Sequence, residues 1–179
     1  YMMEHDIIPS SWSYFIKRKT LGSLRYTPNI YHEDEEFTTR LHYHAESLID
    51  SDILVYHYYV RPDSITQDSD GHKKETRWRD ILSVLQRIKS FHDAVYPVAN
   101  SMQRQGIDRK LTFLTVDTIL NTIYLGKNWA DLHKLCHTSL SELGLYPLPR
   151  RNYTFKYTLF RLLCNNQLGL RLLHTILRK

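Results

Sequence analysis

Cysteine is scarce in this sequence, and several familiar signatures are missing from it. The 179 residues include two cysteines, Cys136 and Cys164, and neither has the spacing of a metal ligand or a second cysteine nearby in the chain. We therefore expect two buried free thiols in a reducing compartment. No apolar run reaches the ~18 residues needed to span a bilayer. No signal peptide is expected, because the first residues lack a basic region followed by an apolar block.

A glycine-rich phosphate loop is also missing, and so is a βαβ nucleotide-binding pattern. If the protein is an enzyme that uses a nucleotide, we expect its nucleotide-binding half to lie outside this chain. The formal net charge is +5, and basic residues concentrate toward the C-terminal end. This balance suits an anionic partner, which leaves nucleotide phosphate, nucleic acid and an acidic membrane surface as alternatives.

The chain divides into two parts of different character. Residues 1–66 are rich in strand and turn signals, whereas residues 72–179 follow helical spacing almost throughout. Aromatic and β-branched residues predict strands over 12–16 and 53–60. Residues 67–71 are expected to form a polar loop. Together these patterns predict an α+β fold.

Helix boundaries are marked clearly in the second part. We expect the first helix to end or kink at Pro97 and the second to stop at Gly126. Asn128 is typical of an N-cap for a third helix, which should end just before Gly144. The last helical stretch is expected to break near Gly169.

Four consecutive acids, Glu33 to Glu36, lie at a predicted junction between a strand-like stretch and a helix of about three turns. Carboxylates crowded together repel one another, so one of them can be held at a pKa useful for base chemistry or near a metal. The alternative is a purely structural one. Acids are stabilised at the positive end of a helix dipole, so the cluster can simply be a helix start.

Three blocks of sequence point to a family. They are SWSYFIKRKTL at 11–21, TPNIYHEDEEFTTRL at 27–41 and YHYYVRPDSIT at 56–66. In this order and spacing they resemble the C-terminal, acceptor-side half of a bacterial family 2 glycosyltransferase with the GT-A fold. The resemblance implies that residues 1–66 are part of a GT-A-like catalytic domain with short strands and a helix. Residues 72–179 would be a mostly α-helical C-terminal region.

The resemblance also implies a reaction and a set of site residues. In such enzymes a sugar moves from a nucleotide sugar to an acceptor hydroxyl with inversion, and a carboxylate takes the hydroxyl proton. That role carries over to Asp34, and Glu33 would orient Asp34 or bind the acceptor. Arg61 and Ser64 would lie near the diphosphate, and Trp12 would form an acceptor platform. The structural alternatives are a turn-closing arginine, a serine cap and a buried aromatic.

The resemblance implies a metal cofactor for the intact enzyme, but the family's metal-binding motif is missing from this chain. A divalent metal, Mn²⁺ or Mg²⁺, would neutralise the leaving diphosphate. The family's Asp-X-Asp motif lies upstream of the three blocks, whereas Asp50-Ser51-Asp52 lies downstream and is interpreted as a turn. We therefore predict no metal on this fragment and no activity from it alone.

The expected partners of the intact enzyme are a nucleotide-sugar donor and a saccharide or lipid-linked acceptor, in bacterial surface polysaccharide synthesis. This places it in the cytoplasm, peripheral to the inner face of the membrane. The C-terminal tail interleaves basic with apolar residues, which suits either an anionic membrane surface or a docked helix with a solvated basic face. A non-catalytic helical interaction module is the alternative function. Nucleic acid is not an expected partner, because no base-reading motif is present.

Overall fold

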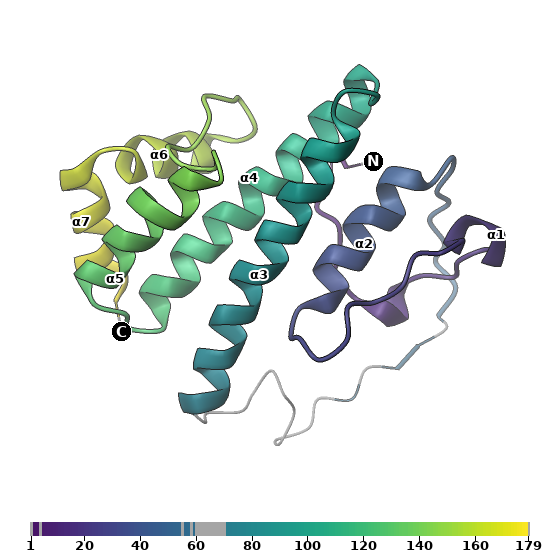
Figure 1. Cartoon of the computed structure of the whole chain (residues 1–179), viewed down its shortest axis with the longest axis horizontal. Coiled ribbons are helices and arrows are strands. Elements are labelled where there is room, and N and C mark those ends of the chain that lie inside the picture. The colour runs from purple at the N-terminus through teal and green to yellow at the C-terminus, as the bar shows by residue number, and fades with distance from the viewer. Residues whose placement is uncertain (1, 4, 55, 58, 60–70, 179) are drawn as a thin grey trace. The chain divides into compact units, whose positions relative to one another are not determined.

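The computed structural model describes residues 2–3, 5–54, 56–57, 59 and 71–178. The chain forms two compact units, residues 1–110 (unit 1) and residues 111–179 (unit 2). Figure 1 follows the chain through both. One helix, α4 (Ser101–Tyr124), contributes its first part to unit 1 and the remainder to unit 2.

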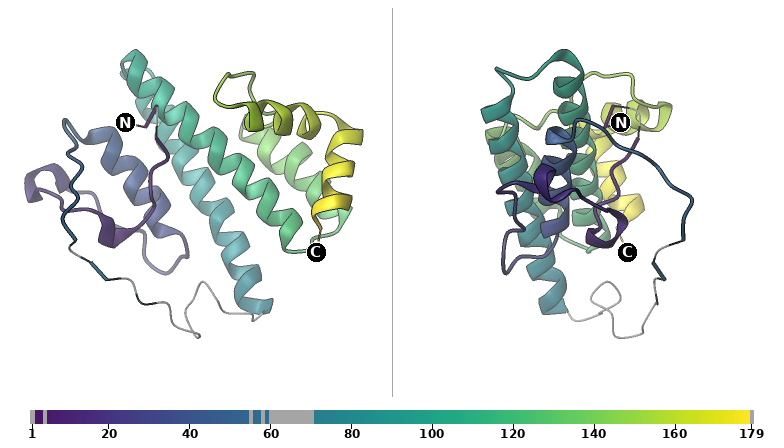
Figure 2. Two further views of the ribbon diagram at one scale, coloured as in Figure 1. Left: turned by 180° about the vertical axis from the view of Figure 1, so that it is seen from behind. Right: turned by 90° about the vertical axis from the view of Figure 1, so that its right-hand side faces the viewer.

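Unit 1 is built around two helices that lie side by side in the views of Figures 1 and 2. These are α2 (Glu33–His44) and α3 (Gly71–Val95). Phe37 and Leu41 of α2 are buried one turn apart, as are Leu85 and Ile88 of α3. Such i, i+3 or i+4 spacing places the apolar residues of each helix on one face, so burial of that face drives the pairing. Two short helical turns precede α2, namely η1 (Ser11–Ser13) and α1 (Arg18–Leu21).

Unit 2 consists of the second part of α4 and four further elements. They are α5 (Trp129–Lys134), the π-helical stretch η2 (Leu135–Leu140), α6 (Phe155–Cys164) and α7 (Gln167–Leu177). The Asn128 side chain caps α5 by accepting a hydrogen bond from the Asp131 N–H at 2.9 Å. Helix α6 packs against α7.

The α+β fold class predicted from the sequence is wrong for the described residues, which form helices and irregular segments but no strand. Residues 12–16 pass from η1 into irregular chain that is assigned to no strand. In the second predicted strand, the described residues 53, 54, 56, 57 and 59 form no ladder, and residues 55, 58 and 60 lie outside the described residues. A strand is stable only when its backbone groups pair with a neighbouring strand, so β-propensity alone does not create one.

The helix ends predicted from the sequence agree better with the structure than the strands do. Helix α3 ends at Val95, two residues before Pro97, and α4 ends at Tyr124, just before Gly126 with φ 71°. The break near Gly169 is misplaced, because the helix ends at Cys164 and Gly169 lies inside α7. The glycine serves close packing there. A Cβ at this position would lie 2.4 Å from the Leu163 carbonyl oxygen.

Candidate active site

The chain enters α2 through a tight, anchored turn. Asn29 and His32 both adopt left-handed conformations, with φ 59° and 63°. Such conformations are uncommon outside glycine and concentrate at functional sites and turns. The Tyr31 N–H donates to Asp80 Oδ2 of α3 at 2.9 Å, which fixes the turn to its neighbouring helix. Burial lowers the pKa of His32, so the imidazole at the N-cap is neutral at pH 7.

The four acids then fill the first turn of α2, where the helix dipole favours negative charge. Their environments differ sharply. Glu36 is buried, and its carboxylate accepts hydrogen bonds from Thr27 Oγ1 at 2.8 Å and from Arg40 Nη1 at 3.1 Å. Arg87 of α3 lies 3.9 Å away. A buried carboxylate with these partners is structural, because a substrate would have to displace them.

Glu35 is also engaged. It forms an ion pair with the Lys110 ammonium, and both side chains are largely shielded from solvent. The pair ties the start of α2 to the segment of α4 that belongs to unit 1. Two of the four acids are therefore held in contacts that stabilise unit 1.

Asp34 is different. Its side chain is half-buried, and no described cation forms an ion pair with it. Burial, followed by the charges of Glu33 and Glu35, raises the pKa of Asp34 to about 6, although N–H groups at the helix start oppose the shift. At neutral pH it remains ionised, yet it is a stronger base than an ordinary aspartate. This combination suits proton abstraction from a hydroxyl.

The structure places only some of the other predicted site residues. Glu33 lies beside Asp34 as the first residue of α2, where its charge helps to raise the Asp34 pKa. Trp12 is 46% exposed and stacks on Tyr56 with ring centroids 4.8 Å apart, so it is not the buried core aromatic that we considered as its alternative. Its contact with an acceptor stays a prediction. Arg61 and Ser64 lie outside the described residues.

The described acids do not fit a metal site. No group of three or more His, Cys, Asp or Glu side chains in the described part of the chain could hold an ion. Two acids of the cluster are already bonded to other side chains. At Asp50-Ser51-Asp52, the Ser51 hydroxyl accepts from the Ile53 N–H at 3.2 Å, which is turn geometry. We therefore assign no step of the chemistry to a metal held by these residues.

Sequence reasoning singled out Asp34 as a candidate but missed the groups that hold its neighbours. Asp80, Arg87 and Lys110 come from positions far along the chain, and no local spacing signals them. Sequence reasoning also missed that the two cysteines are neighbours in the fold. Comparisons with protein-family models, curated proteins and solved structures find no match to this chain.

Proposed function

We propose that this chain is the acceptor-side part of an inverting glycosyltransferase, in which Asp34 deprotonates the acceptor hydroxyl. The observation that carries the proposal is the environment of Asp34. Among the four acids of the first turn of α2, two are bonded to other side chains, whereas Asp34 is partly exposed with its pKa raised to about 6. The motif around it, TPNIYHEDEEFTTRL, supplies the reaction class by resemblance.

The proposed step is a direct displacement. The Asp34 carboxylate accepts the hydroxyl proton while the acceptor oxygen attacks the anomeric carbon, and the bond from that carbon to the diphosphate oxygen breaks. The nucleoside diphosphate leaves with the bonding electron pair, and configuration at carbon inverts. Because Asp34 is partly exposed, the proton can then pass to solvent. Binding of the donor belongs to groups beyond the described residues.

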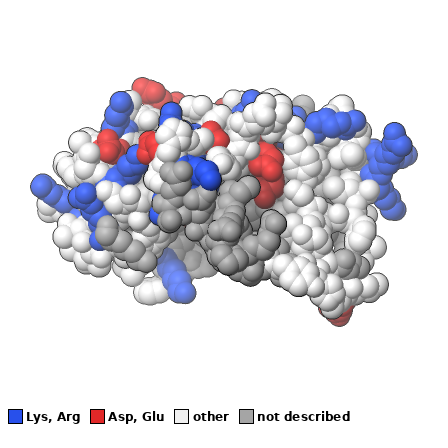
Figure 3. All heavy atoms as spheres, turned by 90° about the horizontal axis from the view of Figure 1, so that it is seen from below, with Lys and Arg blue, Asp and Glu red and all other residues white. Residues whose placement is uncertain are grey.

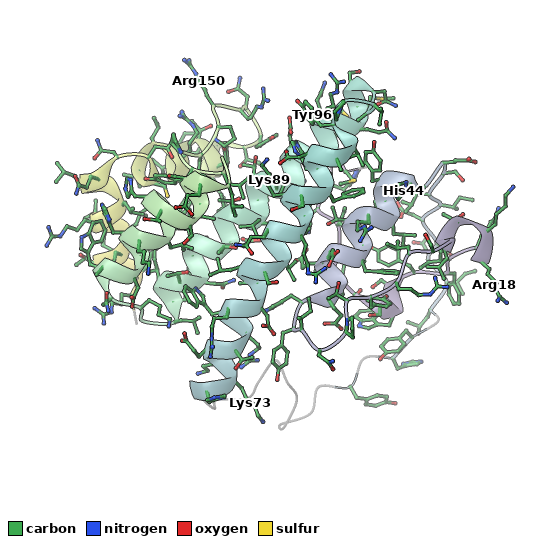
Figure 4. All side chains as sticks on the ribbon, viewed as in Figure 1. Arg18, His44, Lys73, Lys89, Tyr96 and Arg150 are labelled. Carbon is green, nitrogen blue, oxygen red and sulfur yellow. The ribbon has the colours of Figure 1, made fainter. Side chains whose placement is uncertain are left out.

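The surrounding contacts give the base its position. The Tyr31–Asp80 hydrogen bond and the Glu35–Lys110 ion pair lie on either side of Asp34 in the sequence, and each joins this turn to another helix of unit 1. His44, labelled in Figure 4, lies at the opposite end of α2 and contacts Phe91, so it is no part of this site. A base held rigidly loses little entropy when the acceptor binds.

The test is turnover by a protein extended at its N-terminus with the natural upstream sequence, offered a panel of nucleotide sugars with Mn²⁺. Asp34→Asn should lower the rate by about a hundredfold or more, the scale of losing a general base. Asp52→Asn, an exposed acid outside α2, is the matched control and should leave the rate unchanged. Equal rates in the wild type and Asp34→Asn would remove Asp34 as the base. If no donor is turned over, the reaction class is wrong.

One observation favours a second candidate, a non-catalytic helical interaction module. The described residues contain no strand, and the GT-A fold is built on a sheet. This candidate predicts that Asp34→Asn changes no activity and that the acids of α2 serve only as a helix start. The cytoplasmic, membrane-peripheral location and the lipid-linked or saccharide acceptor belong to the glycosyltransferase proposal.

A further inference from the structure

Helix α6 carries three large apolar residues on its exposed side. Phe155, Leu159 and Leu162 are 82%, 50% and 57% exposed. At 100° per residue their i, i+4, i+7 spacing places them within about 60° of one another around the helix. The buried residues Tyr157 and Cys164 lie on the opposite side. The helix therefore has a packed inner face and, in addition, an exposed apolar stripe.

Helix α7 repeats this arrangement. Leu168, Leu172 and Ile176 follow i, i+4, i+8 spacing and are 79%, 51% and 68% exposed. The inner face is fixed by Leu170 and by His174, whose Nε2–H donates to the Lys127 carbonyl at 2.8 Å. Because both inner faces are occupied, the outward stripes are not core residues facing the wrong way. Apolar surface of this kind on two consecutive helices marks an interaction site.

The charge around these stripes identifies the occupant. Residues 143–179 contain seven Lys or Arg and no Asp or Glu. Lys156 on α6 and Arg171 on α7 are exposed beside the stripes, and Arg150, labelled in Figure 4, projects from the loop before α6. The face of the molecule in Figure 3 carries acidic side chains as well as Lys and Arg. Helices α6 and α7 carry Lys156, Arg161 and Arg171 but no acid, and an apolar stripe on such helices is complementary to an anionic lipid surface.

We infer that the α6–α7 pair docks these stripes into the headgroup region of a membrane rich in anionic phospholipid. The helices would lie in the plane of the membrane, with Leu168, Leu172 and Ile176 in the apolar boundary and the flanking cations on lipid phosphates. No described helix is long and apolar enough to cross a bilayer. The inference does not depend on the role of Asp34.

The test is co-sedimentation of the full chain with vesicles of phosphatidylcholine, with and without phosphatidylglycerol. We expect binding to the mixed vesicles and little to pure phosphatidylcholine. Leu168→Ser/Leu172→Ser/Ile176→Ser should weaken binding by about tenfold or more. Arg150→Gln/Lys156→Gln should weaken it on the order of tenfold and reduce its dependence on salt. Every position changed is exposed, so we expect each variant to fold. Far-UV circular dichroism checks this.

The control triple is Phe15→Ser/Ile49→Ser/Val98→Ser, which removes three exposed apolar residues from unit 1. It should leave vesicle binding unchanged. An equal loss of vesicle binding in the two triple variants would show that any exposed apolar residue promotes binding, and would overturn the inference. Equal binding to both kinds of vesicle would overturn the anionic requirement. Failure to bind either kind of vesicle overturns the inference. So does a dimer in sedimentation velocity that dissociates in the α7 triple variant, because a second copy of the chain would then cover the stripes.

Discussion

Unit 1 and unit 2 are both helical, but different kinds of contact hold their helices together. In unit 1, charges join the elements. Lys110 pairs with Glu35, and His92 of α3 lies 2.9 Å from Asp108 of α4. In unit 2, side chains that donate to backbone carbonyls join the elements, as in the Tyr146 hydroxyl that donates to the Cys164 carbonyl at 2.7 Å. The candidate base therefore lies in the unit whose packing depends on ionisation.

The titratable groups of the two units follow the same division. In unit 1, the pKa of Asp34 rises to about 6 through burial. Burial lowers the pKa of His92, but its hydrogen bonds to Asp108 and Asp93 outweigh this and raise it overall. Asp34 therefore titrates closer to neutral pH than an ordinary aspartate, and His92 keeps its proton to a higher pH than an ordinary histidine. In unit 2, burial raises the pKa of Tyr157 to about 12 and lowers that of His137. We expect the stability of unit 1 to respond more strongly to pH near neutrality.

The largest effect should come from removing the charge at the centre of unit 1. Glu36→Ala leaves Arg40 and Thr27 without their buried acceptor, so we expect the free energy of unfolding to fall by about 3 kcal/mol. Urea unfolding followed by circular dichroism measures it. Glu46→Ala, an exposed acid just beyond α2, is the control and should change little. If the free energy of unfolding falls by less than about 1 kcal/mol, Glu36 contributes no more than a surface ion pair. Charge would then not distinguish the packing of unit 1 from that of unit 2.

Unit 2 should be more sensitive to shape than to charge. Gly169→Ala introduces a Cβ 2.4 Å from the Leu163 carbonyl oxygen, which forces α6 and α7 apart. We expect a loss of about 2 kcal/mol in the free energy of unfolding, as for overpacked cores. In Gly71→Ala the new Cβ meets nothing within 4 Å, so that variant should keep wild-type stability. If both variants unfold alike in urea, close packing of α6 on α7 is not what requires the glycine.

The smallest effect concerns the pH dependence of Asp34. Its folded pKa of about 6 exceeds the ordinary 3.8, so the stability it contributes is fully present below about pH 3.8. That stability is lost as the pH rises through about 6. Asparagine cannot ionise, so Asp34→Asn should be more stable than wild type at pH 8, by about 1 kcal/mol after discounting for partial exposure. The two proteins should converge below pH 4. Thermal melts across this range measure the difference, and a constant difference at all pH values would contradict the raised pKa.

The helices were predictable where their signals are local. Asn128 caps α5 through contacts three residues away, and Gly126 ends α4 through its own φ. The strands were not predictable in this way, because a strand depends on a partner that no local pattern supplies. Gly169 was misread for a related reason. Its role is to admit Leu163, a contact between two helices, and not to end a helix.

The candidate site was predictable in part. Crowding of Glu33 to Glu36 correctly pointed to a perturbed carboxyl, and the Asp34 pKa is indeed raised. The leading cause is burial, however, with the neighbouring charges second. Burial depends on how α2 packs, which the sequence does not show. The ion pair from Lys110 is equally invisible, because 75 residues separate it from Glu35.

The buried cysteines provide a built-in probe of opening. Cys136 and Cys164 are the chain's two cysteines, both lie in unit 2, and their thiols contact each other away from solvent. Hydrogen bonding to Cys164, followed by burial, raises the pKa of the Cys136 thiol, so an alkylating reagent meets little reactive thiolate while unit 2 stays closed. The alkylation rate of the unmodified protein therefore reports how often unit 2 opens. Opening confined to unit 1 leaves that rate unchanged.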